Sequence, residues 1–215
     1  RQRQMCIRDR KKGEGMPQPM DGDGTHRRSA LCVGIESYTH LANRSLRYAV
    51  ADATAIAARL ADPQRGNFAV TVLTTPAETT KAAIEEAVKH LLSTPDQRAE
   101  DLALLYFSCH GDVNQADDTF CLLPSDASFQ KKEMLDPTTL ISIYDFARWF
   151  STAKTRNIVV LLDVCHSGGA GAVLQHFPLS LNAGPNYFFI GAARQDQITT
   201  QSSKLEHGLF TNCLL

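Results

Sequence analysis

Two short segments of the chain place a cysteine and a histidine beside glycines at the ends of apolar runs. The first is Ser108-Cys109-His110-Gly111, and the second is Asp163-Val164-Cys165-His166-Ser167-Gly168. A thiol beside an imidazole that can take its proton becomes a nucleophilic thiolate near neutral pH. The two segments therefore indicate acyl transfer at a cysteine, with Cys165 as the nucleophile and His110 as the base.

The glycines of these segments fit the same chemistry. Acyl transfer needs backbone N–H groups aimed at the developing oxyanion, and glycine lets a substrate carbonyl approach the backbone closely. We expect the N–H groups of Gly111 and Cys165 to form this oxyanion hole. Gly168 and Gly169 let the chain turn away without filling the cleft. His166 adjoins the cysteine, but neighbours in an extended chain point to opposite faces, so we expect it to lie outside the reaction.

The elements that must position these residues alternate along the chain. Apolar runs at 30–35, 68–73, 101–108, 120–123, 157–163 and 187–192 predict strands, and runs with helical spacing at 45–60, 79–92, 142–151 and 206–215 predict helices. Near-continuous apolar strands between helices predict an α/β fold with a mostly parallel central sheet flanked by helices on both faces. Sites in such sheets gather beyond the carboxyl ends of strands. His110 and Cys165 meet there if strands 101–108 and 157–163 are neighbours.

Composition excludes several other classes of function. The formal net charge is −1, so no strong field recruits nucleic acid or an anionic membrane, and neither is an expected partner. No apolar run reaches the roughly 18 residues that span a bilayer. The six cysteines form no CxxC pair and show no metal-ligand spacing. Reduced thiols in a cytoplasmic protein are the simplest interpretation.

The domain organisation is read from a change in composition. Residues 1–28 are charged, rich in Gly and Pro and without periodicity, so we expect a disordered or non-native leader there. Residues 29–215 are expected to form one domain. Its last helical run stops at Leu215, so we expect the domain to continue in a longer protein.

The two segments resemble the SGHG and D-A-C-H-S-G signatures of metacaspases and bacterial caspase-like (peptidase C14) domains. Cys165 follows His110 by 55 residues, close to the separation of about 50 in caspases. Further similarity lies in ALCVGI at 30–35, LRYAVADA at 46–53, LLPSDA at 122–127 and HGLFTNCLL at 207–215. The resemblance implies a caspase-like (caspase-haemoglobinase) fold. It also implies a cysteine endopeptidase of clan CD with a Cys165–His110 dyad.

The resemblance also implies a substrate preference. Metacaspases cleave after Arg or Lys, and their S1 pocket residues correspond to Asp52, Ser108 and Asp163. Two carboxylates in one pocket would pair a guanidinium or ammonium group and reject acidic side chains. Taken singly, Asp52 is better interpreted as a solvated helix residue and Asp163 as a turn former at a strand end. Taken together and in register with the family motifs, these residues favour the pocket. The implied partners are proteins or peptides with a basic P1 residue, and the implied state is a monomer.

The chain departs from the family pattern at two places. Cys109 stands where the family usually has Gly, and we expect it to face the core. Many metacaspases are calcium-activated through aspartates after the catalytic His; Asp126 matches one of these, but Asp136 is followed by Pro137 instead of a second acidic residue. No cofactor is therefore expected to be required. Calcium is at most an activator, with Asp126 as its candidate ligand.

The distribution of basic residues bears on activation. No Lys or Arg lies between Cys165 and Arg194, so an enzyme specific for basic residues does not cut itself there, and Lys131-Lys132 is the expected self-cleavage site. Two alternatives stay open. One is a caspase-fold regulatory or scaffold module with weak or no catalysis. The other is an unrelated α/β hydrolytic or redox protein whose thiol mimics the motif.

Overall fold

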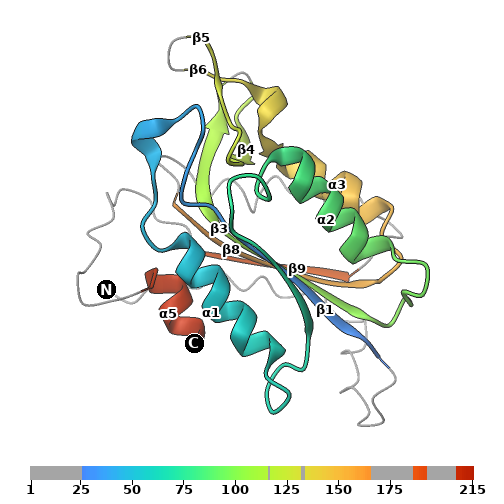
Figure 1. The fold of residues 1–215 in the computed structure, drawn as a ribbon. Helices are drawn as coiled ribbons and strands as arrows, with labels where there is room; N and C mark the ends of the chain where they lie inside the picture. Colours follow the sequence, from blue (N-terminus) through green and yellow to red (C-terminus); the bar gives the residue numbers. More distant parts are fainter. Residues whose placement is uncertain (1–25, 116, 132–133, 166–185, 193–206) are drawn as a thin grey trace, which may run out of the picture.

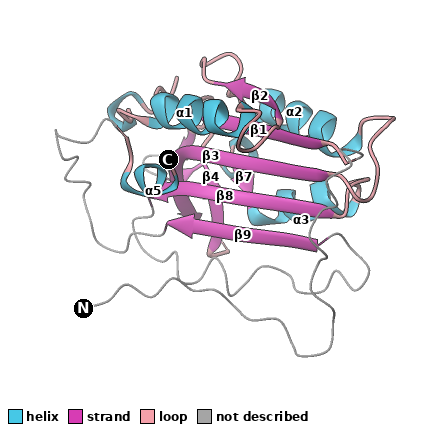
Figure 2. Ribbon diagram, turned by 90° about the horizontal axis from the view of Figure 1, so that it is seen from below, coloured by secondary structure: helices cyan, strands magenta, loops and turns pink. Residues whose placement is uncertain are grey.

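The computed structural model describes residues 26–115, 117–131, 134–165, 186–192 and 207–215. Its centre is a sheet of parallel strands in the spatial order β2-β1-β3-β8-β9. These strands are β1 (Arg28–Gly34), β2 (Ala69–Leu73), β3 (Leu102–Asn114), β8 (Asn157–Cys165) and β9 (Asn186–Ala192). Figure 2 shows them running side by side. The predicted mostly parallel sheet is confirmed.

Helices cover both faces of this sheet (Figure 1). One face carries α1 (Ala49–Ala61) and α5 (Leu209–Leu214), and the other carries α2 (Lys81–Ser93) and α3 (Ile143–Ser151). Two short strands, β4 (Thr119–Leu122) and β7 (Ile141–Ser142), extend the sheet by antiparallel pairing beyond β3. A separate hairpin consists of β5 (Phe129–Lys131) and β6 (Met134–Leu135).

The apolar strands bury side chains on both faces, which explains their lack of alternation in the sequence. In β3, Leu104 and Tyr106 pack with Ala53 and Ile56 of α1. The residues between them face a larger core that includes α2 and α3, with members Ala103, Leu105, Phe107, Ile84, Val88, Phe146 and Phe150. The helices therefore cover both faces of the sheet, and the ends of the strands are where a site can form.

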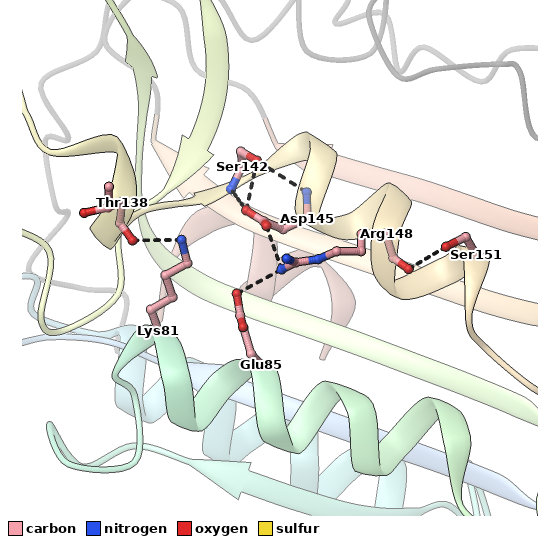
Figure 3. A network of polar contacts seen from close by, with 7 residues as sticks. All are labelled: Lys81, Glu85, Thr138, Ser142, Asp145, Arg148 and Ser151. Carbon is pink, nitrogen blue, oxygen red and sulfur yellow. Dashed lines mark hydrogen bonds and ion pairs between the residues drawn. The ribbon is translucent and has the colours of Figure 1, made fainter.

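Hydrogen bonds join α2 and α3 across that face (Figure 3). The Ser142 hydroxyl accepts from the Asp145 N–H, and the Asp145 carboxylate accepts from the Ser142 N–H, so α3 begins with a reciprocal capping box. Arg148 donates to both Asp145 and Glu85 of α2, at 2.9 and 3.1 Å. Thr80 caps α2 by accepting from the Ala83 N–H.

Several boundaries differ from the sequence-based expectation. The third strand does not end at Ser108: β3 continues to Asn114, because residues 111–114 pair with β4. The first helix begins at Ala49 rather than at Ser45, because Ser45 has an extended backbone where it ends a separate 3-10 turn at 42–44. The β5–β6 hairpin is not expected from sequence because its short strands are largely exposed.

The expected leader at 1–28 overlaps the folded domain by a few residues. Residues 1–25 lie outside the described residues, but Arg28 already belongs to β1 and pairs with Leu102. In the part of the chain that the structure describes, no helix has the length and apolar character needed to cross a bilayer.

Candidate active site

The ends of β3 and β8 bring the two reactive segments together. These parallel strands pair along their whole common length, with Ser108 opposite Asp163 and His110 opposite Cys165. Neighbouring strands lie about 4.8 Å apart, so the backbones of His110 and Cys165 are adjacent at the carboxyl edge of the sheet. The expected neighbourhood of the two strands is confirmed. His166, Gly168 and Gly169 lie outside the described residues.

His110 is oriented by the segment between β1 and α1. Its ring Nε2 lies 2.7 Å from the carbonyl oxygen of Arg44. A carbonyl can only accept, so Nε2 carries the proton, and in the neutral ring Nδ1 is the unprotonated nitrogen. Burial lowers the pKa of His110, and the Arg44 guanidinium lowers it further, although the bond to the Arg44 carbonyl and the charge of Asp112 oppose the shift. The imidazole is therefore neutral and ready to accept a proton.

The backbone of β3 aims the Gly111 N–H toward β8. The N–H of His110 donates to the Tyr38 hydroxyl, and its carbonyl accepts from the Leu123 N–H, so both groups of His110 use the edge that faces β1 and β4. Successive residues of a strand direct these groups to alternate edges. The Gly111 N–H consequently lies on the β8 edge, where the chain reaches Cys165.

Asp52 is buried on α1 and makes its contacts with the far end of the chain. Only 2% of the residue is exposed, so the interpretation of Asp52 as a solvated helix residue is wrong. Its Oδ1 accepts from His207 Nδ1 at 2.9 Å, and both its oxygens lie 3.1 Å from the Gly208 N–H. Burial raises the pKa of Asp52 and the charge of Asp163 adds to this, whereas the hydrogen bonds from Gly208 and His207 lower it.

Asp163, at the end of β8, binds the same C-terminal segment. Its Oδ2 accepts from the Thr211 hydroxyl at 2.7 Å and from the Thr211 N–H at 3.3 Å. The Tyr106 hydroxyl lies 2.6 Å from the Thr211 hydroxyl oxygen. Because Thr211 gives its only hydroxyl proton to the carboxylate, Tyr106 is the donor in that pair. Ser108, the register partner of Asp163, is buried beside this network.

Gly208 lies between the two carboxylates. A Cβ atom on Gly208 would stand 2.9 Å from the Oδ2 of Asp52 and 2.9 Å from the Oδ2 of Asp163. These two oxygens are thus no more than twice that distance apart, and the expected convergence of the carboxylates is present. Gly208 has φ −57°, which any residue adopts. The carboxylates, not the backbone, exclude a side chain here.

An open cleft of about 580 Å³ lies beside Arg44 and Asp112. Its walls are the loop before α1, the outer part of β3 and the β5–β6 hairpin. Arg44 pairs with Asp112 at 3.0 Å and lies over the ring of Phe129. Arg44 therefore lines this cleft and, through its backbone carbonyl, also contacts the ring of His110.

The remaining candidate residues have ordinary structural surroundings. Cys109 is 2% exposed and belongs to the larger core, as expected for a substitution that faces inward. Asp126 accepts from the Lys81 N–H at the start of α2. Among the described residues, no group of three His, Cys, Asp or Glu side chains is placed to hold a metal ion. Calcium activation through Asp126 stays a prediction.

Sequence reasoning assigned no role to Arg44, Tyr38, His207, Gly208 or Thr211. Of these, only His207, Gly208 and Thr211 carried a signal, because they belong to the HGLFTNCLL segment that resembles the family. Arg44 contacts His110 through its backbone carbonyl and Tyr38 contacts it through its hydroxyl. Neither contact can be predicted from the types and spacing of the residues.

Comparison with known proteins agrees with the fold. The caspase domain model (peptidase C14) matches residues 27–215, and the chain belongs to this family. Its members are cysteine-type peptidases of clan CD, so this is the class of the domain.

One similar solved structure is the crystal structure of protein GSU0716 from Geobacter sulfurreducens, with a TM-score of 0.51 and 23% sequence identity. The match covers 69% of this chain and 54% of that one, so the chain spans about half the length of its neighbour. At this identity the likeness shows the fold alone. No curated protein matches the chain.

Proposed function

We propose that this domain is a metacaspase-like cysteine endopeptidase that cleaves peptide bonds after Arg or Lys with a Cys165–His110 dyad. The observation that carries the proposal is the pairing of His110 with Cys165 at the ends of two adjacent parallel strands. The bond from His110 Nε2 to the Arg44 carbonyl supports it, since it leaves Nδ1 as the base.

In the first half of the reaction, Nδ1 of His110 takes the proton of the Cys165 thiol, and the thiolate attacks the carbonyl carbon of the substrate. An S–C bond forms while the carbonyl electron pair moves onto oxygen. The N–H groups of Gly111 and Cys165 receive this oxyanion. The direction of the Gly111 N–H, toward the β8 edge, supports its part in this step.

In the second half, the imidazolium of His110 gives its proton to the leaving nitrogen, and the C–N bond breaks. A water molecule attacks the thioester that remains and gives a proton to Nδ1, the S–C bond breaks, and the imidazolium passes that proton to the sulfur of Cys165. This releases the new carboxylate of the substrate and restores the thiol. The same ring nitrogen thus serves as base and acid in turn.

The preference for basic residues rests on Asp52, Ser108 and Asp163. The oxygens of the two carboxylates converge beside Gly208, where a guanidinium or ammonium group would make charge-assisted hydrogen bonds with them. An acidic P1 side chain would be repelled by both. We expect protein or peptide substrates, a monomeric and cytoplasmic enzyme, and no required cofactor.

Hydrolysis of short fluorogenic peptides ending in Arg, Lys or Asp tests the proposal. We expect cleavage after Arg and Lys, none after Asp, and loss of activity in Cys165→Ala and His110→Ala variants whose thermal unfolding resembles that of the wild type. Adding calcium in parallel shows whether it activates. Cleavage after Asp alone would reject the acidic pocket.

A second candidate is a caspase-fold module without strong catalysis. The observation that favours it is that both carboxylates are already bound within the chain, Asp52 by His207 and Gly208, and Asp163 by Thr211. Failure of the purified protein to cleave any of the peptides would favour this module over the peptidase.

A further inference from the structure

His207 binds one of the two carboxylates to which the proposed function assigns the recognition of basic side chains. Its Nδ1 lies 2.9 Å from Asp52 Oδ1, and the side chains are 25% and 3% exposed respectively. The imidazole therefore lies at the partly open end of this contact, and the carboxylate lies behind it. Of these two side chains, the imidazole is the one that solvent reaches.

The other contacts of Asp52 use a different group. The Gly208 N–H reaches both carboxylate oxygens at 3.1 Å. A guanidinium group pairs best with a carboxylate when it bonds to both oxygens at once. Oδ1 already accepts from both His207 and Gly208, which uses its two lone pairs, so such pairing requires one of these donors to leave. The imidazole is on a side chain that can rotate away, whereas the Gly208 N–H is part of the backbone at the start of α5.

The start of α5 is held independently of the His207 side chain. Thr211 gives two hydrogen bonds to Asp163 and receives one from Tyr106. Thr211 is fully buried. These contacts, with the Gly208 N–H on Asp52, dock the helix without any need for an imidazole at position 207.

We propose that His207 is a specificity-determining residue that occupies the position of the P1 cation at Asp52 in the free enzyme and is exchanged for that cation when substrate binds. This inference rests on the proposed function. This exchange lowers the affinity for basic side chains, because the substrate can contact Asp52 only after the hydrogen bond between His207 and Asp52 has broken. Arg is affected more than Lys, since an ammonium group is a point charge that needs one oxygen.

The test compares KM and kcat of the wild type with those of His207→Ala on peptides with Arg or Lys at P1. We expect KM for the Arg peptide to fall about fivefold in the variant, the size of effect that one competing hydrogen bond produces, with kcat little changed and a smaller fall for Lys. His207→Asn, which keeps a neutral donor near the position of Nδ1, is expected to lie between the two. His90→Ala, on the exposed surface of α2, is the matched control and leaves KM unchanged.

Contrary results separate the inference from the function on which it rests. If the wild type cleaves Arg peptides and His207→Ala has the same or a higher KM, His207 only positions the pocket, and the inference is wrong while the function stands. A His207→Ala protein that does not fold would also overturn it, because the docking of α5 would then depend on the imidazole. If the wild type cleaves no peptide, the proposed function and the inference fail together.

Discussion

His110 shows how a backbone contact prepares a side chain for chemistry. The Arg44 carbonyl holds Nε2 in the protonated form, and the same residue's guanidinium lowers the pKa of the ring. Both effects come from one residue in the loop before α1: its carbonyl selects the tautomer in which Nδ1 is unprotonated, and its guanidinium favours the neutral ring. The role of Arg44 is thus positioning and electrostatic, with no contact to substrate required.

The pH dependence of activity follows from this arrangement. Because the pKa of His110 is lowered from its ordinary 6.5, we expect the acid limb of kcat/KM to lie below that value, where a free histidine would already be protonated. Arg44→Met keeps the backbone carbonyl but removes the cation and leaves Asp112 without its partner. Both changes favour the imidazolium, so the acid limb moves to higher pH. The measurement is kcat/KM against pH on an Arg peptide.

Arg65→Met is the matched control for that measurement. Arg65 pairs with Asp62 at the opposite end of α1, so its loss leaves the acid limb in place. An acid limb that is unchanged or lower in Arg44→Met would show that the Arg44 side chain does not act on His110.

At the scale of elements, the length of β3 decides where the catalytic residues lie. The strand continues through His110 and Gly111 because β4 pairs with its outer part. His110 is therefore held within a strand rather than on a free loop, and the N–H of Gly111 takes its direction from the strand geometry. Because residues 112 and 114 are polar, a prediction based on apolar runs does not include this extension of the strand.

The start of α3 is another element whose stability depends on a local signal. In Figure 3 Ser142 and Asp145 bond reciprocally, and Arg148 joins Asp145 to Glu85 of α2. Ser142→Ala removes the N-cap, so we expect the free energy of unfolding to fall by about 1 kcal/mol. Ser151→Ala, at the exposed end of the same helix, is expected to change it by about 0.5 kcal/mol or less.

Urea unfolding monitored by circular dichroism compares the two variants of α3. Equal effects of Ser142→Ala and Ser151→Ala would contradict a stabilising role for the capping box. Since α3 packs on the core face opposite α1 and α5, we expect KM to stay unchanged in both variants.

At the scale of the whole molecule, the distribution of basic residues predicts where the protein cleaves itself. No Lys or Arg lies between Cys165 and Arg194, and Lys131 is exposed on the β5–β6 hairpin. We expect mass spectrometry of the purified active protein to find a cut after Lys131 or Lys132 and none within 166–193. Cys165→Ala protein, prepared in the same way, stays whole. A cut within 166–193 would contradict specificity for basic residues.

Much of this protein was determined by its sequence alone. The apolar runs predicted a mostly parallel sheet and the runs with helical spacing predicted its helices, because strands buried on both faces leave a strong local pattern. The two segments around His110 and Cys165 marked the catalytic candidates and the family, since their residue types and glycines stand close together in the chain. These features depend on neighbours within a few residues.

Only the tertiary structure decided how the site is assembled. Asp52 bonds to His207, which lies 155 residues later, and His110 bonds to the carbonyl of Arg44, 66 residues earlier. Such contacts depend on how the strands cross over and in which register they pair, and a backbone carbonyl carries no side-chain signal. Burial is also decided by the tertiary structure. Asp52 could be a surface residue by its type alone, but the packed fold buries it and gives its carboxylate hydrogen bonds from His207 and Gly208.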